Sequence, residues 1–307
     1  MSQTNPENHR SVVEALLGHA VSRATHTLST IVEEEVTAPE KRPTTAAEPK
    51  LRLWDIPRSS YNGNPALTPT ALAHSQWSHI IRPGIDSAID ATCGNGYDSI
   101  YLAKMLFSLD DPIDYTSMKS ELVCVDIQKQ ACESTRDQLA QWMDPSILEK
   151  HVQIVHSSHS PLPRPKDDSS VALVVWNLGY LPNSNEKELY TQMESTISSI
   201  VDAALMVRIG GMLSITSYPK TNPKENCAVH GLVEALALLS SKEHDWRHFV
   251  SELEPDASGQ YSVRDAVQAA VNTIVHRGDT KQTWRVFQHK VVGRPLSPIL
   301  LTATRIK

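Results

Sequence analysis

The sequence predicts an α/β fold whose core is a mainly parallel sheet of seven strands, with an antiparallel pair at the C-terminal edge. Seven short apolar runs rich in Val, Ile and Leu follow one another, and longer amphipathic segments lie between most of them. Such alternation is typical of βαβ units and a parallel sheet. The last two runs are joined only by VGRPLSP, which leaves no room for a crossover helix and therefore indicates an antiparallel pair.

Each run and each amphipathic segment gives an expected element. We expect strands at residues 87–91, 121–126, 152–156, 171–177, 212–218, 283–291 and 298–304, and helices near 97–107, 128–142, 188–208 and 223–240. Segment 241–282 does not fit a minimal sheet, because it contains the turn-prone EPDASGQ and a helix-like stretch at 262–277. We interpret it as an insertion.

The composition separates one large domain from an N-terminal extension. With 307 residues and 40% hydrophobic content, the chain can bury a substantial core, which we place at residues 68–307. The extension at 1–67 carries one candidate helix, at 11–32, and the polar linker EEEVTAPEKRPTTAAEPK.

Bulk features exclude several classes of protein. No run reaches the roughly 18 to 20 apolar residues of a membrane helix, so we expect no membrane partner and an intracellular protein, cytoplasmic or targeted to mitochondria or plastids. Four cysteines without a C-x-x-C pair indicate neither a zinc ribbon nor a disulfide framework. The net charge of -6 argues against a uniformly basic nucleic-acid binder, yet seven Lys or Arg lie in residues 277–307 against one acid, a distribution suited to contacting phosphate.

The stretch AIDATCGNGYDS at residues 88–99 suggests three ligands: a dinucleotide, S-adenosylmethionine (SAM), or a metal held through Cys93. A glycine turn between a strand and a helix brings backbone N–H groups against a ligand. The third position of the dinucleotide fingerprint G-x-G-x-x-G is Ser99 here, and the acid ending the next strand, Asp126, lies about 30 residues on rather than roughly 20. Both departures count against NAD.

A SAM site needs an acid at the end of the first strand, a glycine turn, and an acid at the end of the second strand for the ribose hydroxyls. Asp90, Gly94 with Gly96, and Asp126 occupy these places in order. One carboxylate offers two acceptor oxygens to the two adjacent hydroxyls of a ribose. The alternative for Asp126 is an ordinary residue of a turn. For Cys93 we expect packing in the turn and no metal, since nothing nearby supplies further ligands.

Two further strand ends point to the same edge of the sheet. In VVWNLGYLPNSN at 174–185, Asn177 and Tyr180 leave the fourth strand, where a carbonyl can accept from a target amine and an aromatic ring can contact a base or a sulfonium. The alternative is a turn with a core tyrosine. In HSSHSPLP at 156–163, Ser157, Ser158 and His159 leave the third strand and can contact adenine. A loop histidine is more often structural, and His159 is also an acid/base candidate.

These motifs together resemble the MnmM (YtqB-type) methyltransferases, above all in DATCGNG, VDIQ and NLGYLP, while the closing GRPLSP is nearest to plant-like members. The resemblance covers residues 72–305. It implies a Rossmann-like class I SAM-dependent methyltransferase that acts on the tRNA anticodon loop. It also implies methylation of the amine of 5-aminomethyl-2-thiouridine, the wobble base, to 5-methylaminomethyl-2-thiouridine.

By motif match the resemblance also implies site residues. Those of the SAM site would be Asp90, Gly94, Asn95, Gly96, Asp98, Asp126, Ile127 and Gln128, while Asn177, Gly179 and Tyr180 would lie between donor and base. From their positions at the strand ends we add Thr92, Ser158, His159 and Asn177 to the expected SAM site. The catalytic candidates are Asn177, Tyr180 and His159. This chain departs from the family at residues 183–186 and at Lys220 and Thr221, two loops expected near the substrate.

Several alternatives stay open. A SAM-dependent methyltransferase of rRNA, protein or a small amine fits the same motifs, as does a SAM-binding module without catalysis, and a dehydrogenase ranks third. A homodimer is one possible assembly. Four cations, Arg285, Lys290, Arg294 and Arg305, are candidates for contact with RNA phosphates, although a solvated basic surface is an equal interpretation.

Overall fold

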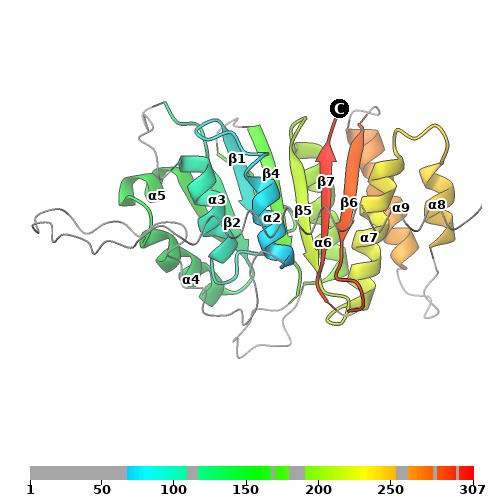
Figure 1. The fold of residues 1–307 in the computed structure, drawn as a ribbon, viewed down its shortest axis with the longest axis horizontal. Helices are drawn as coiled ribbons and strands as arrows, with labels where there is room; N and C mark the ends of the chain where they lie inside the picture. Colours follow the sequence, from blue (N-terminus) through cyan, green and yellow to red (C-terminus); the bar gives the residue numbers. More distant parts are fainter. Residues whose placement is uncertain are drawn as a thin grey trace, which may run out of the picture. The chain divides into compact units, whose positions relative to one another are not determined.

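The computed structural model describes residues 68–108, 117–166, 170–179, 191–253, 262–278, 282–294 and 297–307. They form a seven-stranded sheet with strand order β3-β2-β1-β4-β5-β7-β6 (Figure 1). All neighbouring strands pair in parallel except those of β7, which is antiparallel to both β5 and β6. The strands are β1 Asp86–Asp90, β2 Leu122–Asp126, β3 Val152–His156, β4 Ser170–Asn177, β5 Met212–Ser217, β6 Trp284–His289 and β7 Ile299–Arg305. The predicted sheet and its antiparallel edge pair are confirmed.

The helices agree with the amphipathic segments in the middle of the chain. Expected and observed spans overlap for α3 Tyr97–Phe107, α4 Lys129–Ala140, α6 Met193–Met206, α7 Pro223–Leu238 and α9 Val263–Arg277. Three short helices had not been expected: α2 Pro69–Trp77, α5 Pro145–His151 and α8 Trp246–Glu252. The helix expected at 11–32 lies outside the described residues.

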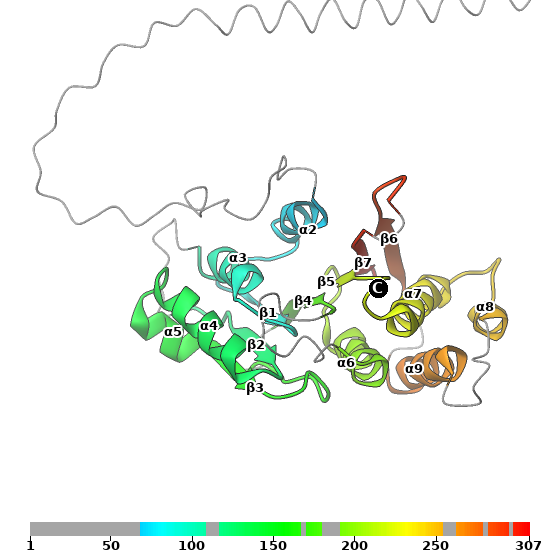
Figure 2. The same ribbon diagram turned by 90° about the horizontal axis from the view of Figure 1, so that it is seen from below.

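Helices cover both faces of the sheet (Figure 2). On one face α2, α3, α4 and α5 pack on a core that includes Leu102, Leu106 and Leu139. On the other face α6, α7, α8 and α9 pack on a core that includes Trp176, Ile200 and Leu232. Two layers of helices therefore enclose the sheet, and the strand ends remain the natural place for a ligand.

Segment 241–282, interpreted from the sequence as an insertion, builds α8 and α9 on the second face. A capping box starts α9, because the side chains of Ser262 and Asp265 reciprocally bond each other's backbone N–H groups. Val267, Val271 and Ile274 of α9 are buried against α6 and α7. The segment therefore contributes to the hydrophobic core of the domain.

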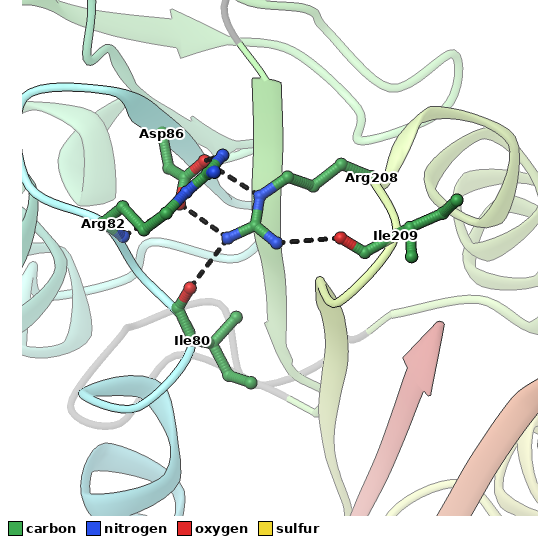
Figure 3. Close-up of polar contacts among 5 residues, drawn as sticks. All are labelled: Ile80, Arg82, Asp86, Arg208 and Ile209. Carbon is green, nitrogen blue, oxygen red and sulfur yellow. Dashed lines mark hydrogen bonds and ion pairs between the residues drawn. The ribbon is translucent and has the colours of Figure 1, made fainter. Parts of the chain in front are cut away.

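An ion cluster fixes the amino-terminal end of β1 (Figure 3). The fully buried carboxylate of Asp86 accepts from Arg82 Nη2 at 2.6 Å and from Arg208 Nη2 at 2.6 Å, and Arg208 also donates to the carbonyls of Ile80 and Ile209. Burial opposes ionisation, but the hydrogen bonds from both arginines outweigh it and lower the pKa of Asp86 to about 2. The depressed pKa contributes about 2 kcal/mol of stability above pH 4, which is lost as the pH falls towards 2.

Candidate active site

The carboxyl ends of β1, β2 and β4 bring together three polar side chains, each the last residue of its strand: Asp90, Asp126 and Asn177. Parallel pairing of β1 with both β2 and β4 places these ends at the same edge of the sheet. The sequence stretches that suggested a ligand site therefore meet in space.

The turn from β1 to α3 requires glycine. Gly94 has φ 51° and Gly96 has φ 81°, both in the left-handed region that residues with a Cβ rarely adopt. A Cβ at Gly96 would lie 2.9 Å from the Cα of Thr135 in α4. The turn is tied down by Gly96 N donating to the Cys93 carbonyl at 2.8 Å, and by Thr135 Oγ1 donating to the Gly94 carbonyl at 3.1 Å.

Asp126 holds this turn from the end of β2. Its Oδ2 accepts from Gly94 N at 3.0 Å and its Oδ1 accepts from Gln128 N at 2.9 Å. Burial raises the pKa of this carboxyl, against the backbone donors Gln128, Gly94 and Ile127. A carboxylate has about four acceptor positions, so the geometry is compatible with a contact to a ribose hydroxyl. A glycine-loop N–H of the kind that would bind a pyrophosphate is occupied by a carboxylate instead.

Asp90 lies beneath the turn and is 2% exposed. Its Oδ2 accepts from Ser99 Oγ at 2.6 Å and its Oδ1 from Thr92 N at 3.3 Å. Burial, with the nearby charges of Asp98 and Asp126, raises the pKa of Asp90 to about 7. Three carboxyl groups thus surround one glycine turn, an electrostatic setting that disfavours a phosphate and favours a cation.

Asp98, in the first turn of α3, connects the end of β4 to α2. One of its oxygens, Oδ1, lies 2.6 Å from His74 Nε2, and the other accepts from the side-chain amide of Asn177. His74 also lies against the ring of Tyr101, with centroids 3.7 Å apart. Because a carboxylate only accepts, Asn177 must present its Nδ2 to Asp98, and its carbonyl oxygen Oδ1 is left for another donor.

Helix α2 covers a small pocket at this end of β4 and β5. Its start is defined by Thr68, whose side chain accepts from Ala71 N, and by Pro69 at the first helical position. Trp77 Nε1 donates to Ser214 Oγ at 2.9 Å, which fixes α2 to β5. The pocket is lined by Thr70, Ala73, Trp77, Asp98, Val175, Trp176, Asn177 and Thr216.

His159, the acid/base candidate, is buried behind the turn. Its Nε2 lies 3.4 Å from Thr196 Oγ1, and its ring also hydrogen-bonds the backbone of Ala91. Burial lowers the pKa of His159 to about 4, so the imidazole is neutral at pH 7. Since both contacts lie within the fold, this geometry favours a role in supporting the turn over one in proton transfer.

The other expected SAM-site residues follow the carboxyl ends of β1, β2 and β3. Thr92 Oγ1 accepts from Asn177 N at 2.7 Å, which joins the turn to β4. Ile127 is 60% exposed directly after β2, and Gln128 is the N-cap of α4. Ser158 Oγ accepts from Ser160 N at 3.2 Å in the loop after β3. Asn95 lies in the turn itself.

Cys93 is 4% exposed, and hydrogen bonding with Cys132 followed by burial raises the pKa of its thiol. This environment agrees with packing in the turn. Among the residues that the structure describes, no group of three or more His, Cys, Asp or Glu side chains gathers to hold a metal ion.

One site residue was not anticipated from the sequence, His74 on α2, whereas Tyr218 follows β5 in the loop expected near the substrate. The Tyr218 ring packs beside Gly179, where an added Cβ would lie 3.6 Å from Tyr218 Cδ2. The Thr68-Pro69 pair, a helix-start signal, could have revealed α2. Tyr180 and residues 183–186 lie outside the described residues.

The four candidate phosphate contacts divide between opposite edges of the sheet. Arg285 pairs with Thr304 of β7, and Arg305 is the next residue after Thr304. Thr304 pairs with Met212, so both arginines lie beside the start of β5. Arg305 also donates to the Val207 carbonyl at 2.8 Å. Lys290 and Arg294 instead lie at the carboxyl edge with Asn177, because β6 ends there. Antiparallel pairing therefore directs Arg285 and Arg305 away from the site, and of the four candidates Lys290 and Arg294 share the edge with Asn177.

Fold and site together define a class I SAM-dependent methyltransferase domain. Its marks are the strand order with an antiparallel β7, the glycine turn after β1, and the acid that ends β2. Residues 122–251 match the family model described as "Putative rRNA methylase". Within the described ranges, we find no helix with the length and apolar character needed to span a membrane.

Three known proteins resemble the chain. The tRNA (mnm(5)s(2)U34)-methyltransferase, chloroplastic, of Arabidopsis thaliana is 34% identical over 150 residues, which are 48% of this chain and 52% of that protein. The chain thus spans about half the length of this curated relative. A putative rRNA methylase structure from Clostridium thermocellum has 20% identity, a TM-score of 0.49 and coverage of 78% of this chain and 98% of its own. A putative methyltransferase from Streptococcus mutans, solved with SAH, has 21% identity, a TM-score of 0.47 and the same coverage.

Proposed function

We propose that the protein is a SAM-dependent N-methyltransferase of the tRNA wobble uridine, which converts 5-aminomethyl-2-thiouridine to 5-methylaminomethyl-2-thiouridine. The observation that carries the choice of cofactor is the hydrogen bond from Gly94 N to the Asp126 carboxylate. The Asp126 carboxylate occupies the backbone N–H group that would otherwise bind the pyrophosphate of a dinucleotide, and its negative charge would repel that pyrophosphate. The substrate is supported by the name of the Arabidopsis relative, a mnm(5)s(2)U34 tRNA methyltransferase.

The residues present fit SAM. When bound, SAM supplies an electrophilic methyl group on a positively charged sulfonium. Asp126 would accept hydrogen bonds from the ribose hydroxyls with the acceptor capacity that Gly94 and Gln128 leave unused. The carboxyl groups of Asp90 and Asp98 would balance the positive charge of the cofactor, and Ile127 offers an exposed apolar side chain beside Asp126.

Asn177 would position the acceptor amine. Its Nδ2 is committed to Asp98, so its Oδ1 can accept a hydrogen from the amine in the pocket that Asn177 lines. Such a contact orients the nitrogen lone pair toward the methyl carbon. Orientation of this kind supplies much of the rate in a transfer between two bound reactants. Tyr180 is our candidate for contact with the base.

The pocket would also favour the reactive form of the amine. An alkyl amine resembling that of lysine has a pKa of about 10.4 in water and must lose a proton before it attacks. Trp77 and Val175 contribute apolar walls, which disfavour the charged ammonium form. Transfer forms the N–C bond and breaks the C–S bond, with the C–S electron pair retained by sulfur.

Mass spectrometry of tRNA nucleosides from cells that lack this protein tests the proposal. We expect 5-methylaminomethyl-2-thiouridine to disappear and 5-aminomethyl-2-thiouridine to accumulate, with both reversed when the gene is restored. An unchanged wobble nucleoside together with a missing methyl group in rRNA or protein would refute the tRNA assignment.

We also propose that residues 1–67 direct the protein to plastids, a compartment supported by the word "chloroplastic" in the name of the relative. A fluorescent protein fused behind residues 1–67 should accumulate there. Cytoplasmic fluorescence would contradict plastid import.

A further inference from the structure

Three stretches near the pocket contain no Asp or Glu: residues 68–85, 210–224 and 282–307. The first includes α2, the second includes β5 and the loop after it, and the third includes β6 and β7. Pairing of β5 with β7 and of β7 with β6 places the second and third side by side. The chain has a net charge of -6, yet the corner of the domain formed by these three stretches has no acidic residue of its own.

The strand register places three cations of these stretches at the same edge as the pocket. Asn177 pairs with Thr216, and both line the pocket, so Lys220 follows only four residues later. Ser217 pairs with Ile299, where β7 begins, and His289 pairs with Leu300. Lys290 and Arg294 accordingly lie in the β6–β7 connection at this edge.

Contacts with α7 locate Lys290 beside the end of β5. His230 of α7 has its Nε2 3.4 Å from Ser217 Oγ, and Ser217 Oγ donates to Asn226 Oδ1 at 2.9 Å. Burial and the positive charge of Lys290 both lower the pKa of His230, which places Lys290 near this same group.

The three cations are exposed, and the nearest acid in the sequence does not neutralise them. Lys220, Lys290 and Arg294 all lie on the surface, exposed to solvent. Glu225, in the first turn of α7, is 3% exposed and accepts hydrogen bonds from Thr191 and Thr196. The positive potential at this corner is thus directed to solvent.

We propose that Lys220, Lys290 and Arg294 form a cationic rim that binds the phosphodiester backbone of the RNA whose base reaches Asn177. The inference rests on the RNA methyltransferase function proposed above and assigns the surface that grips the substrate. Phosphate contacts of this kind fix the register of a nucleic acid without reading its sequence. A base splayed out of the anticodon loop would then reach Asn177 from a backbone held on the rim.

The chain offers a matched control on the same hairpin. Arg285 and Lys307 are also exposed and also carry two positive charges, but they lie at the opposite edge of the sheet, where Arg285 pairs with Thr304 and the Lys307 carbonyl accepts from Thr283 N. The double variant Lys290→Ala/Arg294→Ala and the control Arg285→Ala/Lys307→Ala therefore change net charge equally. Lys220→Ala is a third variant, on a different loop.

The experiment measures, for the full chain, the affinity for unmethylated tRNA at several salt concentrations, together with KM for tRNA, kcat and SAM affinity. For the Lys290/Arg294 variant we expect tRNA affinity to fall about tenfold and the slope of log K against log salt to decrease by about 1.4 to 1.8. kcat at saturating tRNA and SAM affinity should stay within about twofold. Lys220→Ala should also weaken tRNA binding and therefore raise the KM for tRNA.

The outcomes separate the rim from the activity. An unchanged tRNA affinity in the Lys290/Arg294 variant, or an equal loss in the Arg285/Lys307 control, would overturn the rim while leaving the methyltransferase intact. If the wild-type protein methylates protein or a small amine and no RNA, both the proposed function and the rim fail. Unchanged thermal unfolding of each variant verifies that the fold is retained.

Discussion

Asp90 shows how a single buried carboxyl prepares the site for a cationic ligand. It is 2% exposed, hydrogen-bonded by Ser99 and Thr92, and close to the charges of Asp98 and Asp126. Burial and like charge make ionisation costly, which raises the pKa of Asp90 to about 7. A positively charged ligand beside it would reverse part of that cost.

The raised pKa predicts how stability depends on pH. Because the folded state keeps the Asp90 proton that the unfolded chain loses near pH 4, stability falls as the pH rises from about 4 to about 7. Asp90→Asn, which remains neutral, should lose less stability over this interval. Thermal unfolding at a series of pH values measures the difference, and Asp137→Asn on the exposed side of α4 should behave as wild type. Parallel profiles for wild type and Asp90→Asn would contradict the assigned ionisation.

At the scale of elements, α2 is the helix that completes the pocket. It places His74 2.6 Å from Asp98, which in turn bonds the amide of Asn177, and it is itself fixed by Trp77 to Ser214. His74 touches neither cofactor nor substrate in this account, so it is a positioning residue for Asn177.

His74→Phe keeps a ring against Tyr101 and removes the contact with Asp98. We expect kcat to fall about tenfold, since Asp98 and then Asn177 lose their fixed orientation, while SAM affinity changes by less than about threefold. His79→Phe, at an exposed position just beyond α2, is the control and should keep wild-type kcat. A larger loss in SAM affinity than in kcat would assign His74 to cofactor binding instead.

Which elements could be predicted from sequence follows from their physical signals. Strands β1, β2, β4 and β5 are almost wholly buried, so continuous apolar runs reveal them. Helices α3, α4, α6 and α7 each bury one face more fully than the other, so an amphipathic pattern reveals them. Helices α2 and α5 are short and show little periodicity. Only their caps indicate them, Thr68 with Pro69 and Asp144 with Pro145.

The site was predictable in part for a related reason. Asp90, Asp126 and Asn177 end strands, and strand ends share an edge whatever the details of packing. The partners that orient them depend on helix placement in three dimensions: His74 lies 24 residues from Asp98, and Asp98 lies 79 residues from Asn177. Arg285 and Arg305 lie at the opposite edge from Lys290 because of the directions of β6 and β7. The number of charges along the sequence carries no information about strand direction.

At the scale of the whole molecule, the two edges of the sheet have different roles. The amino edge of β1 is closed by the Asp86 cluster, where Arg82 and Arg208 compensate a buried charge within the fold. At the carboxyl edge, Asp98 has His74 as its partner, whereas the hydrogen-bond donors to Asp90 and Asp126 in the described part of the chain are a hydroxyl and backbone N–H groups. A cationic ligand would compensate these two carboxyl groups, which supports the assignment of a cationic cofactor.

Calorimetric titration of the full chain tests whether the glycine turn held by Asp126 binds SAM. We predict that the wild-type protein binds SAM and does not bind NAD, and that Asp126→Ala lowers SAM affinity about 10- to 100-fold through the loss of charge-assisted hydrogen bonds to the ribose. Asp137→Ala should retain wild-type affinity. Wild-type SAM affinity in Asp126→Ala, or binding of NAD in place of SAM, would contradict the account.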